Sequence, residues 1–360
     1  MKDITFRPYE NGDEIAIIAL FEKVFKKHMG QTESLLHWQW EFKSNPVKPI
    51  SIYLAWHKGR LIGQYAVNPI RFSVSGKPTL MALSLDTMTD PDYAGKGIFQ
   101  KAAMHLYQSL VEHEVSCVFG FPNSNSVSGF KRKLGWEIVT VPPVYLCPIS
   151  PFNDTRKKYV NLLKGLCFNT HSFFLKRKLS LFEERHKHLK IRTEAAFDLW
   201  VDELWEKCRH QHDVLVVRDL AYLRWRFNER PESAYEYHTV WYQEIIAGYI
   251  VTIDKMRDEG MVTFLLDIMA DLSIKGAADA LIAAVLRSSY EKNNSLVSTI
   301  LMPGSPYKMT FLKNYFLPLP RLLFPQKIYF GVKQLSENPL LPDALKQKHW
   351  HLCWGDTDLL

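Results

Sequence analysis

The residues best suited to bind a charged ligand lie where a predicted strand runs into a predicted helix. Residues 81–90 alternate between apolar and polar side chains, which predicts a half-buried strand with Asp86 on its polar side. The sequence DPDYAGKGIF (residues 90–99) follows, and apolar residues then recur at helical spacing. Gly95 and Gly97 therefore occupy a strand-to-helix turn. Backbone N–H groups in such a turn, with the helix N-terminus behind them, can bind a pyrophosphate, and a plain tight turn is the alternative.

This turn resembles the acyl-CoA-binding segment of the GNAT acyltransferases. In that family a strand leads through a Pro-acid-aromatic sequence into an Arg/Gln-x-x-Gly-x-Gly/Ala loop. Gly95 and Gly97 match the loop, whereas Ala94 stands where Arg or Gln is usual and Phe99 stands where a small residue is usual. The later sequence VFGFPNSNSVSGFKRKLGW (residues 118–136) resembles the next strand and helix of the family.

The resemblance implies a role for each matching residue. The backbone edge near Thr87 and Met88 would pair with the pantetheine arm of CoA, and Asn123 would hydrogen-bond to it. The family often has a tyrosine seven residues after this asparagine as general acid; the position is Phe130 here, so the acid is unassigned. The expected co-substrate is an acyl-CoA, either acetyl-CoA or 3-hydroxybutanoyl-CoA, and no metal is expected. The CoA pyrophosphate would be bound by the backbone amides of Gly95, Lys96, Gly97, Ile98 and Phe99.

Attack of an amine on a thioester requires removal of one proton and stabilisation of an oxyanion. Two residues are candidates for the base, Asp86 on the predicted strand and His105 on the helix that follows. His105 has the alternative of a packed or solvated helix histidine. Asp86 has the alternative of a structural role, because Asp267 occupies a matching place later in the chain.

An internal repeat sets the domain organisation. The motif Trp-x-Phe-x-x-x-Pro begins at Trp40 and again at Trp225, and Trp56 matches Trp241 at the same spacing. After a short slip, the match continues with further pairs in the same order: Asp86 with Asp267, Gly95 with Gly276, Pro122 with Pro303 and Phe130 with Phe311. The sequence thus predicts an α/β (α+β) protein of two tandem GNAT-like domains, each a mixed, mostly antiparallel sheet flanked by helices.

We place the acyl-CoA-binding domain at residues 1–150 and a degenerate second domain at residues 191–330. A basic helical connector at 151–190 would join them, and the tail at 331–360 has no readable chemistry. The second copy keeps Gly276 but lacks the second glycine and the Pro-acid-aromatic approach. We therefore expect it not to bind CoA, and we expect the acceptor to lie in the cleft between the domains.

The acceptor is less well defined than the fold. His37 and Trp38 are not repeated, which makes them the candidates for acceptor binding, whereas the recurring tryptophans indicate core packing. The two-domain pattern resembles GNAT proteins that acylate dTDP-linked 3-amino-3,6-dideoxyhexoses in bacterial surface-polysaccharide pathways. That resemblance implies a nucleotide-linked amino sugar as acceptor. An aminoacyl or peptide amine, or a non-catalytic CoA- or glycan-binding protein, are the alternatives.

The bulk composition fits such an enzyme. A formal charge of +7 favours anionic partners, which CoA and a nucleotide sugar satisfy without nucleic acid. The 5 cysteines show no Cys-x-x-Cys spacing, which indicates free thiols in a reducing compartment. No stretch resembles a signal peptide or a membrane span. We therefore expect a cytoplasmic protein.

Overall fold

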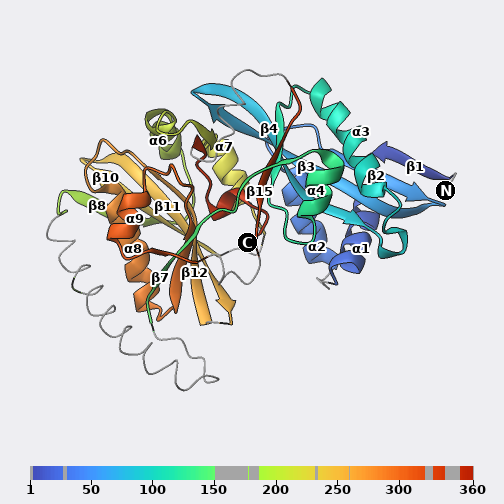
Figure 1. The fold of residues 1–360 in the computed structure, drawn as a ribbon. Helices are drawn as coiled ribbons and strands as arrows, with labels where there is room; N and C mark the ends of the chain where they lie inside the picture. The colour runs from blue at the N-terminus through green and yellow to red at the C-terminus, as the bar shows by residue number, and fades with distance from the viewer. Residues whose placement is uncertain are drawn as a thin grey trace.

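The computed structural model describes residues 3–26, 31–150, 177, 186–231, 234–258, 260–320, 327–336 and 349–359. These residues form two lobes that lie side by side (Figure 1). The first lobe consists mainly of residues 3–140 and the second lobe mainly of residues 186–320. In the part of the chain that the structure describes, no helix is long and apolar enough to span a membrane.

The first lobe follows the order that the sequence predicts, with a long meander of strands interrupted by helices. Its strands are β1 (Ile4–Pro8), β2 (Ser51–His57), β3 (Arg60–Val74), β4 (Lys77–Thr89), β5 (Cys117–Gly120) and β6 (Glu137–Thr140). Its helices are α1 (Glu14–Phe25), α2 (Gln31–Trp38), the π-helix η1 (Gln39–Lys43), the short 3-10 helix η2 (Pro91–Tyr93), α3 (Ile98–Glu112) and α4 (Val127–Leu134).

The remaining chain repeats much of this order. Its strands are β7 (Val144–Pro148), β8 (Leu189–Glu194), β9 (Val214–Val216), β10 (Tyr235–Tyr242), β11 (Ile245–Arg257), β12 (Gly260–Ala270), β13 (Leu296–Ile300), β14 (Leu317–Pro318) and β15 (Phe330–Gln334). Its helices are α6 (Trp200–Cys208), α7 (Leu220–Leu223), the π-helix η3 (Arg224–Asn228), α8 (Ala277–Glu291), α9 (Lys308–Lys313) and the 3-10 helix η6 (Trp354–Asp356).

Both sheets are mixed and mostly antiparallel, which confirms the predicted fold class. The first sheet has the order β1-β2-β3-β4-β5-β15-β6, with β9 paired to β3, and the second has the order β14-β7-β13-β12-β11-β10-β8. Among the neighbouring strands of these sheets, β4 with β5 and β12 with β13 are the parallel pairs. Helix α3 packs on the first sheet and α8 packs on the second.

The two lobes share the repeated unit of strands and helices, with one correction to the sequence alignment. Helices α3 and α8 each span 15 residues and each begin after a glycine in the left-handed conformation. These capping glycines are Gly97 and Gly276, with φ angles of 76° and 89°. The sequence match paired Gly276 with Gly95 instead. The second lobe therefore keeps the capping glycine and lacks the earlier one, because its loop is shorter.

The two halves of the chain exchange strands. β15, from the C-terminal part of the chain, lies between β5 and β6 in the first sheet. β7, which follows the first lobe in sequence, lies between β13 and β14 in the second sheet (Figure 1). Each sheet is therefore complete only with a strand from the opposite end of the chain. Of the predicted connector at 151–190, only residue 177 and residues 186–190 fall within the described part of the chain.

The repeated tryptophan motifs meet at the junction of the lobes. The rings of Trp40 and Trp225 stack with their centroids 5.7 Å apart. The Trp40 indole N–H donates to the Trp225 carbonyl at 2.5 Å, and the Trp225 indole N–H donates to the Trp40 carbonyl at 2.8 Å. The two copies of the motif thus contact each other reciprocally, which confirms that these tryptophans pack in the core.

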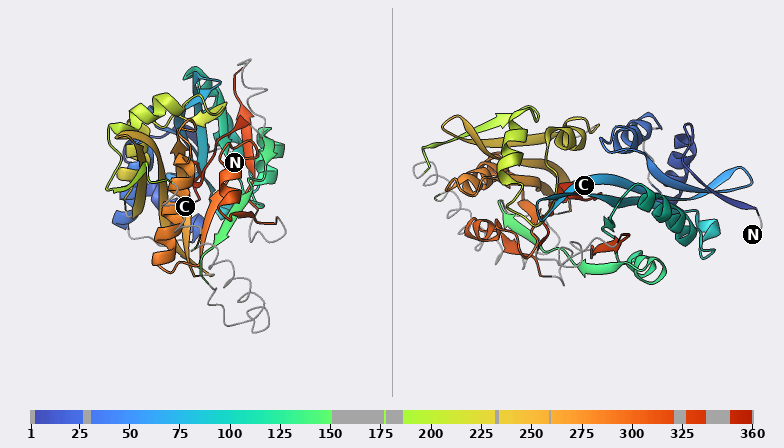
Figure 2. Two further views of the ribbon diagram at one scale, coloured as in Figure 1. Left: turned by 90° about the vertical axis from the view of Figure 1, so that its left-hand side faces the viewer. Right: turned by 90° about the horizontal axis from the view of Figure 1, so that it is seen from above.

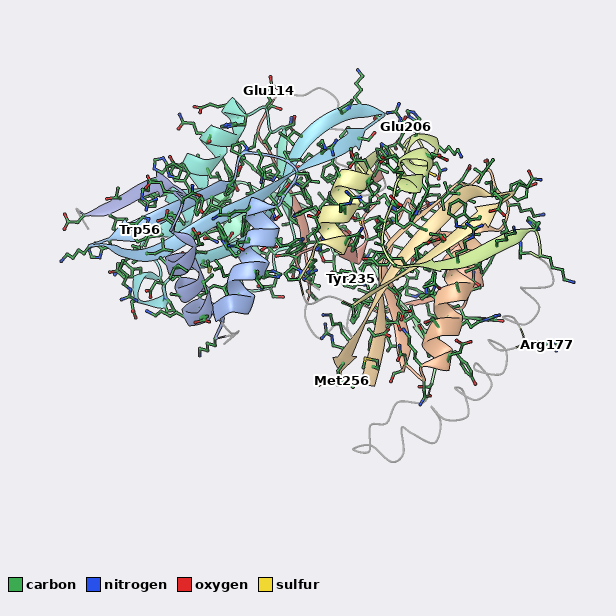
Figure 3. The ribbon with its side chains drawn as sticks, turned by 180° about the vertical axis from the view of Figure 1, so that it is seen from behind. Trp56, Glu114, Arg177, Glu206, Tyr235 and Met256 are labelled. Atoms are coloured by element: carbon green, nitrogen blue, oxygen red, sulfur yellow. The ribbon has the colours of Figure 1, made fainter. Side chains whose placement is uncertain are left out.

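The second pair of repeated tryptophans, Trp56 and Trp241, makes a different kind of contact. In Figure 3, Trp56 lies at the end of the first lobe that is far from the second lobe. Tyr235 marks the region where the second lobe faces the first. Arg7 lies over the ring of Trp56, and Arg192 lies over the ring of Trp241 in the same way. Figure 2 shows the C-terminus of the chain between the two lobes.

We expect loss of either tryptophan at the junction to destabilise the whole chain. Trp40→Ala and Trp225→Ala should each lower the free energy of unfolding by about 3–5 kcal/mol, because each removes a buried ring and leaves one carbonyl unpaired. The double variant should cost less than the sum, because both changes remove one shared contact. Denaturant unfolding followed by circular dichroism measures these values. Leu199→Ala, at a side chain that is 73% exposed, is the control and should change stability by less than about 0.5 kcal/mol. Fully additive losses would contradict a shared contact.

Candidate functional site

A buried aspartate fixes the turn that follows β4. Asp90 is 0% exposed and forms ion pairs with Lys23, at 2.7 Å, and with Arg60. It also accepts a hydrogen bond from the backbone N–H of Asp92 at 3.1 Å. Burial opposes ionisation of Asp90, but these partners outweigh it and lower its pKa. The charged Asp90 thereby anchors the start of the glycine turn to α1 and β3.

The glycine turn presents open backbone at the start of α3. Gly95 and Gly97 both have φ angles of 76°, and the space above each is empty out to 4 Å. The first N–H groups of α3, including those of Ile98 and Phe99, have no carbonyl one turn earlier in the helix to bond with. The Lys96 ammonium donates to the carbonyl of Asp92 at 3.1 Å and stays beside the turn. This geometry suits a pyrophosphate.

Beyond this turn, β4 separates from β5. The two strands pair only from Met81 with Cys117 to Ser84 with Gly120. The pairing of β4 with β3 also shifts register next to Asp86, which has a φ angle of 44°. This bulge is held by Gln64, whose amide donates to the Asp86 carbonyl at 3.0 Å. The backbone of residues 85–88 therefore has no strand partner on its β5 side within the described residues. Thr87 and Met88 lie in this segment, where the backbone can pair with an extended ligand.

Asn123 lies at the end of β5, on the other side of this split. Its side-chain oxygen accepts from the backbone N–H groups of Asn125, at 2.9 Å, and Ser126, at 3.2 Å. Within the described residues its amide NH2 donates to no partner, so this donor is available to a ligand.

Two phenylalanines take the places where the sequence departs from the family pattern. Phe130 makes edge contacts with Phe99, at 5.3 Å between centroids, and with Trp136, at 4.7 Å. The ring of Phe99 also lies 5.8 Å from that of Tyr65. These rings pack on one another and offer no acid at position 130.

An interlobe cavity of about 390 Å³ opens beside the bulge of β4. Asp86, His37 and Trp38 line it from the first lobe, and Arg226 and Arg230 line it from the second. The structure therefore brings together the predicted base and both predicted acceptor residues. Its volume lies within the usual range of small-molecule sites.

Trp38 lines this cavity with its ring packed against neighbouring side chains. The residue is 4% exposed, with Tyr9, Phe42 and Lys43 packed around its ring. Its indole N–H has no hydrogen-bond partner among the described residues. A buried donor without a partner is costly.

Three carboxyl groups from distant parts of the chain converge in the interlobe cavity. Glu41 and Asp358 line it together with Asp86. Burial, and then the charge of Asp86, raise the pKa of Glu41 well above its ordinary value. Desolvation by the surrounding chain, and then the charge of Asp86, raise the pKa of Asp358 to about 7, although part of the residue is exposed. Glu41 and Asp358 therefore hold protons more tightly than ordinary carboxyls, and Asp358 can exchange one near neutral pH.

Cations from the second lobe face these carboxyl groups. Arg230 and Lys255 line the same cavity, and the guanidinium of Arg230 lies 5.0 Å from the centroid of Trp40. Arg226 is buried and donates to the carbonyls of Gly355, at 2.8 Å, and Thr357, at 2.9 Å. It therefore holds the C-terminal segment in place and does not lie on a solvated face.

His105 lies elsewhere. It is exposed on α3, where its ring stacks on Tyr53 at 5.3 Å and contacts Phe6 at 5.5 Å. It does not line the interlobe cavity. This placement corresponds to the solvated helix histidine that the sequence allowed as the alternative.

The equivalent site in the second lobe is closed. A Cβ on Gly276 would lie 2.4 Å from the ring of His186, so this ring covers the turn that is open at Gly97. β12 pairs with β13 over only part of its length. Past that stretch the C-terminal segment packs against β12 so closely that a Cβ on Gly355 would lie 2.7 Å from the Leu266 carbonyl oxygen. These contacts agree with the expectation that the second copy does not bind CoA.

The aspartate of the second lobe also has a different environment. Asp267 accepts from Arg218 at 2.9 and 3.2 Å and from the Tyr249 hydroxyl at 2.9 Å. Arg218 also pairs with Asp356. These groups are buried and pair with one another, whereas Asp86 lines a cavity. The two aspartates match in the repeat, but Asp267 is a buried structural carboxylate and Asp86 lines a cavity.

Three residues of the cavity, Glu41, Thr357 and Asp358, were not predicted from the sequence. Glu41 lies inside the repeated tryptophan motif and could have been noted there, because the matching residue in the second copy is Arg226. Asp358 and Thr357 lie in the tail, and no motif marks them.

Comparison with known protein families finds a match in the first lobe. Residues 5–139 match the model of the acetyltransferase (GNAT) domain. No curated protein sequence matches the chain.

Several solved structures share the architecture of both lobes. A GCN5-related N-acetyltransferase from Anabaena variabilis superposes with a TM-score of 0.65 at 12% identity, over 92% of this chain and 73% of that one. A tandem GNAT protein from the clavulanic acid biosynthesis pathway gives 0.56 at 11% identity, over 93% and 100% of the two chains. The N-myristoyltransferase of Saccharomyces cerevisiae gives 0.57 at 10% identity, over 92% and 83%. At these identities the similarity establishes a tandem GNAT fold.

We expect Gly97→Trp to abolish binding of CoA. The new side chain would fill the open space of the turn and would strain a residue whose φ angle is 76°. Isothermal titration should show an affinity for CoA at least 100-fold weaker. Gly12→Trp is the matched control, because Gly12 also has a positive φ and open space but lies in the loop before α1. If Gly97→Trp binds CoA as the wild type does, the turn is not the pyrophosphate site.

Proposed function

We propose that this chain is an acyl-CoA-dependent N-acyltransferase whose first lobe binds CoA and whose acceptor amine enters the interlobe cavity. One observation carries the proposal: the cavity reaches the bulge of β4 at Asp86, next to the split where an acyl-CoA thioester would lie. The match of residues 5–139 to the GNAT domain supports the reaction class.

The GNAT domain would bind the donor mainly through its backbone. The amides of residues 95–99 would hold the pyrophosphate, the edge near Thr87 and Met88 would pair with pantetheine, and Asn123 would donate its amide NH2. Ala94 removes the usual Arg or Gln contact, so Lys96 is the nearby cation. The solved neighbours include N-acetyltransferases and one enzyme with bound myristoyl-CoA. Acetyl-CoA and 3-hydroxybutanoyl-CoA are the first donors to test.

In the proposed reaction, the neutral amine attacks the thioester carbonyl while Asp86 takes the amine proton. The bond between nitrogen and carbon forms, the bond between carbon and sulfur breaks, and the CoA thiolate takes up a proton. Asp358, once ionised, increases the proton affinity of this cluster because its negative charge lies near that of Asp86, and Glu41 retains its proton beside them. The carboxyl groups would also attract the acceptor while it is still an ammonium ion.

The charge distribution supports an acceptor with a cationic amine and an anionic group. Asp86, Glu41 and Asp358 line the cavity, and Arg230 and Lys255 contribute positive charge from the second lobe. A nucleotide-linked amino sugar, such as a dTDP-linked 3-amino-3,6-dideoxyhexose, has both features: the amine would lie at Asp86 and the diphosphate at these cations. The carboxylate of an amino acid or peptide could use the same cations, which makes an aminoacyl or peptide amine the second candidate.

Acceptor-dependent release of free thiol tests this function. Acetyl-CoA and 3-hydroxybutanoyl-CoA would be incubated with dTDP-amino sugars, UDP-amino sugars, amino acids and peptides. We expect release that depends on one class of amine. Binding of CoA without release for any acceptor would overturn the catalytic proposal and favour a non-catalytic CoA-binding protein.

We expect Asp86→Asn to lower kcat by about 10²–10⁴-fold, the usual contribution of a general base. The affinity for acyl-CoA should stay within about twofold, because the CoA contacts use backbone atoms. For the wild type, kcat/KM should rise as the pH increases through about 7, because the base must be ionised and Asp358, with a pKa of about 7, belongs to the same cluster. Stopped-flow or thiol-detection assays between pH 5 and 9 measure both effects.

Asp358→Asn separates the roles of the two aspartates. Removing its negative charge lowers the proton affinity of Asp86, so the rise in kcat/KM should move to lower pH while kcat falls less than tenfold. A large loss of kcat in Asp358→Asn with little loss in Asp86→Asn would contradict Asp86 as the base.

A further inference from the structure

A second cavity, of about 250 Å³, lies on the face of the second sheet opposite α8. Cys147, Leu265 and Val297 pack on the side of the sheet that α8 covers. Because side chains alternate along a strand, the residues next to them in sequence face the opposite side, where this cavity lies. The floor is formed by such neighbours on β7, β12 and β13: Val144, Leu146, Val262, Phe264, Leu296 and Ile300.

This cavity is apolar, in contrast to the interlobe cavity. Among the lining side chains that the structure describes, Arg257, Ser298 and Thr357 are the polar ones, apart from the indole N–H of Trp354. The guanidinium of Arg257 lies 5.2 Å from the centroid of Phe264. A hydrocarbon chain fits this lining, whereas a charged acceptor does not.

The apolar cavity adjoins the proposed reaction site. Thr357 and Leu359 line both cavities, so the C-terminal segment separates them. Phe121 also lines the apolar cavity, and it follows Gly120, the last residue of β5 that pairs with β4. A thioester in the split would therefore have the acceptor cavity on one side and the apolar cavity on the other.

We propose that the apolar cavity holds the acyl chain of the donor and that the preferred donor is a medium-chain acyl-CoA. This inference rests on the proposed function. An engineered apolar cavity of about 150 Å³ accepts benzene, so about 250 Å³ has room for on the order of ten carbon atoms. An acetyl group would leave this apolar surface unfilled.

The test uses the full chain and the saturated acyl-CoAs from acetyl to myristoyl, at concentrations below those at which they form micelles. Dissociation constants from isothermal titration and thiol release with the best amine are both measured. Each buried methylene strengthens binding by up to about fourfold. We therefore expect decanoyl-CoA to bind at least tenfold more tightly than acetyl-CoA, with the preference declining for chains beyond the cavity length.

Two variants of opposite size locate the chain. Ser298 is buried in β13 and lines the cavity between Leu146 and Phe264, its strand partners. Ser298→Phe should reduce the ratio of decanoyl to acetyl affinity at least tenfold, and Phe264→Ala should move the preferred length to longer chains. Met309→Phe, at an exposed position of α9, is the control and should leave this ratio unchanged.

The outcomes distinguish this inference from the proposed function. Equal binding of acetyl- and decanoyl-CoA, or a chain-length preference that neither variant alters, would overturn the assignment of the acyl cavity and leave the acyltransferase proposal intact. Failure of acyl-CoA of every length to bind would overturn the proposed function itself. If Ser298→Phe does not fold, Phe264→Ala still decides the case, because only a chain in this cavity responds to its enlargement.

Discussion

The exchange of β7 and β15 holds the two lobes together, and the candidate site depends on it. β15 pairs with β5 and β6, and β7 pairs with β13 and β14. Separating the lobes would break backbone hydrogen bonds within both sheets, so the lobes cannot part as two independent domains. The reciprocal contact of Trp40 and Trp225 lies at the same junction. A cavity between the lobes can then have fixed walls.

The C-terminal segment makes the two similar lobes different, because it closes the site of the second lobe and contributes residues to the cavity beside the first. Where Gly355 contacts Leu266, the segment occupies the backbone of β12 that corresponds to the free edge of β4. Asp356 joins Asp267 on Arg218, which turns the second aspartate into a structural group. The same segment then passes into the interlobe cavity, where Asp358 joins Asp86. The residues that close one site thereby complete the other.

The sequence contains enough information for the fold and part of the site. The repeated tryptophan motif predicts two related lobes, and the strand, glycine turn and helix around Gly97 predict the open turn that the structure contains. These features are local in the chain, so spacing reveals them. The exchange of β7 and β15, the meeting of Asp358 with Asp86, and the burial of Arg226 depend on contacts between residues far apart, and no local pattern marks them. The alignment of Gly276 with Gly95 failed because the second loop is shorter, and only the helix caps show which glycines correspond.

The most direct test of the account is a crystal structure of the chain with CoA bound. We predict one CoA per chain, with its pyrophosphate on the amides of residues 95–99 and its pantetheine along residues 85–88, ending beside Asp86. The second lobe should hold no CoA, with His186 still covering Gly276. CoA bound to the second lobe, or bound in the first lobe away from the split between β4 and β5, would contradict the account.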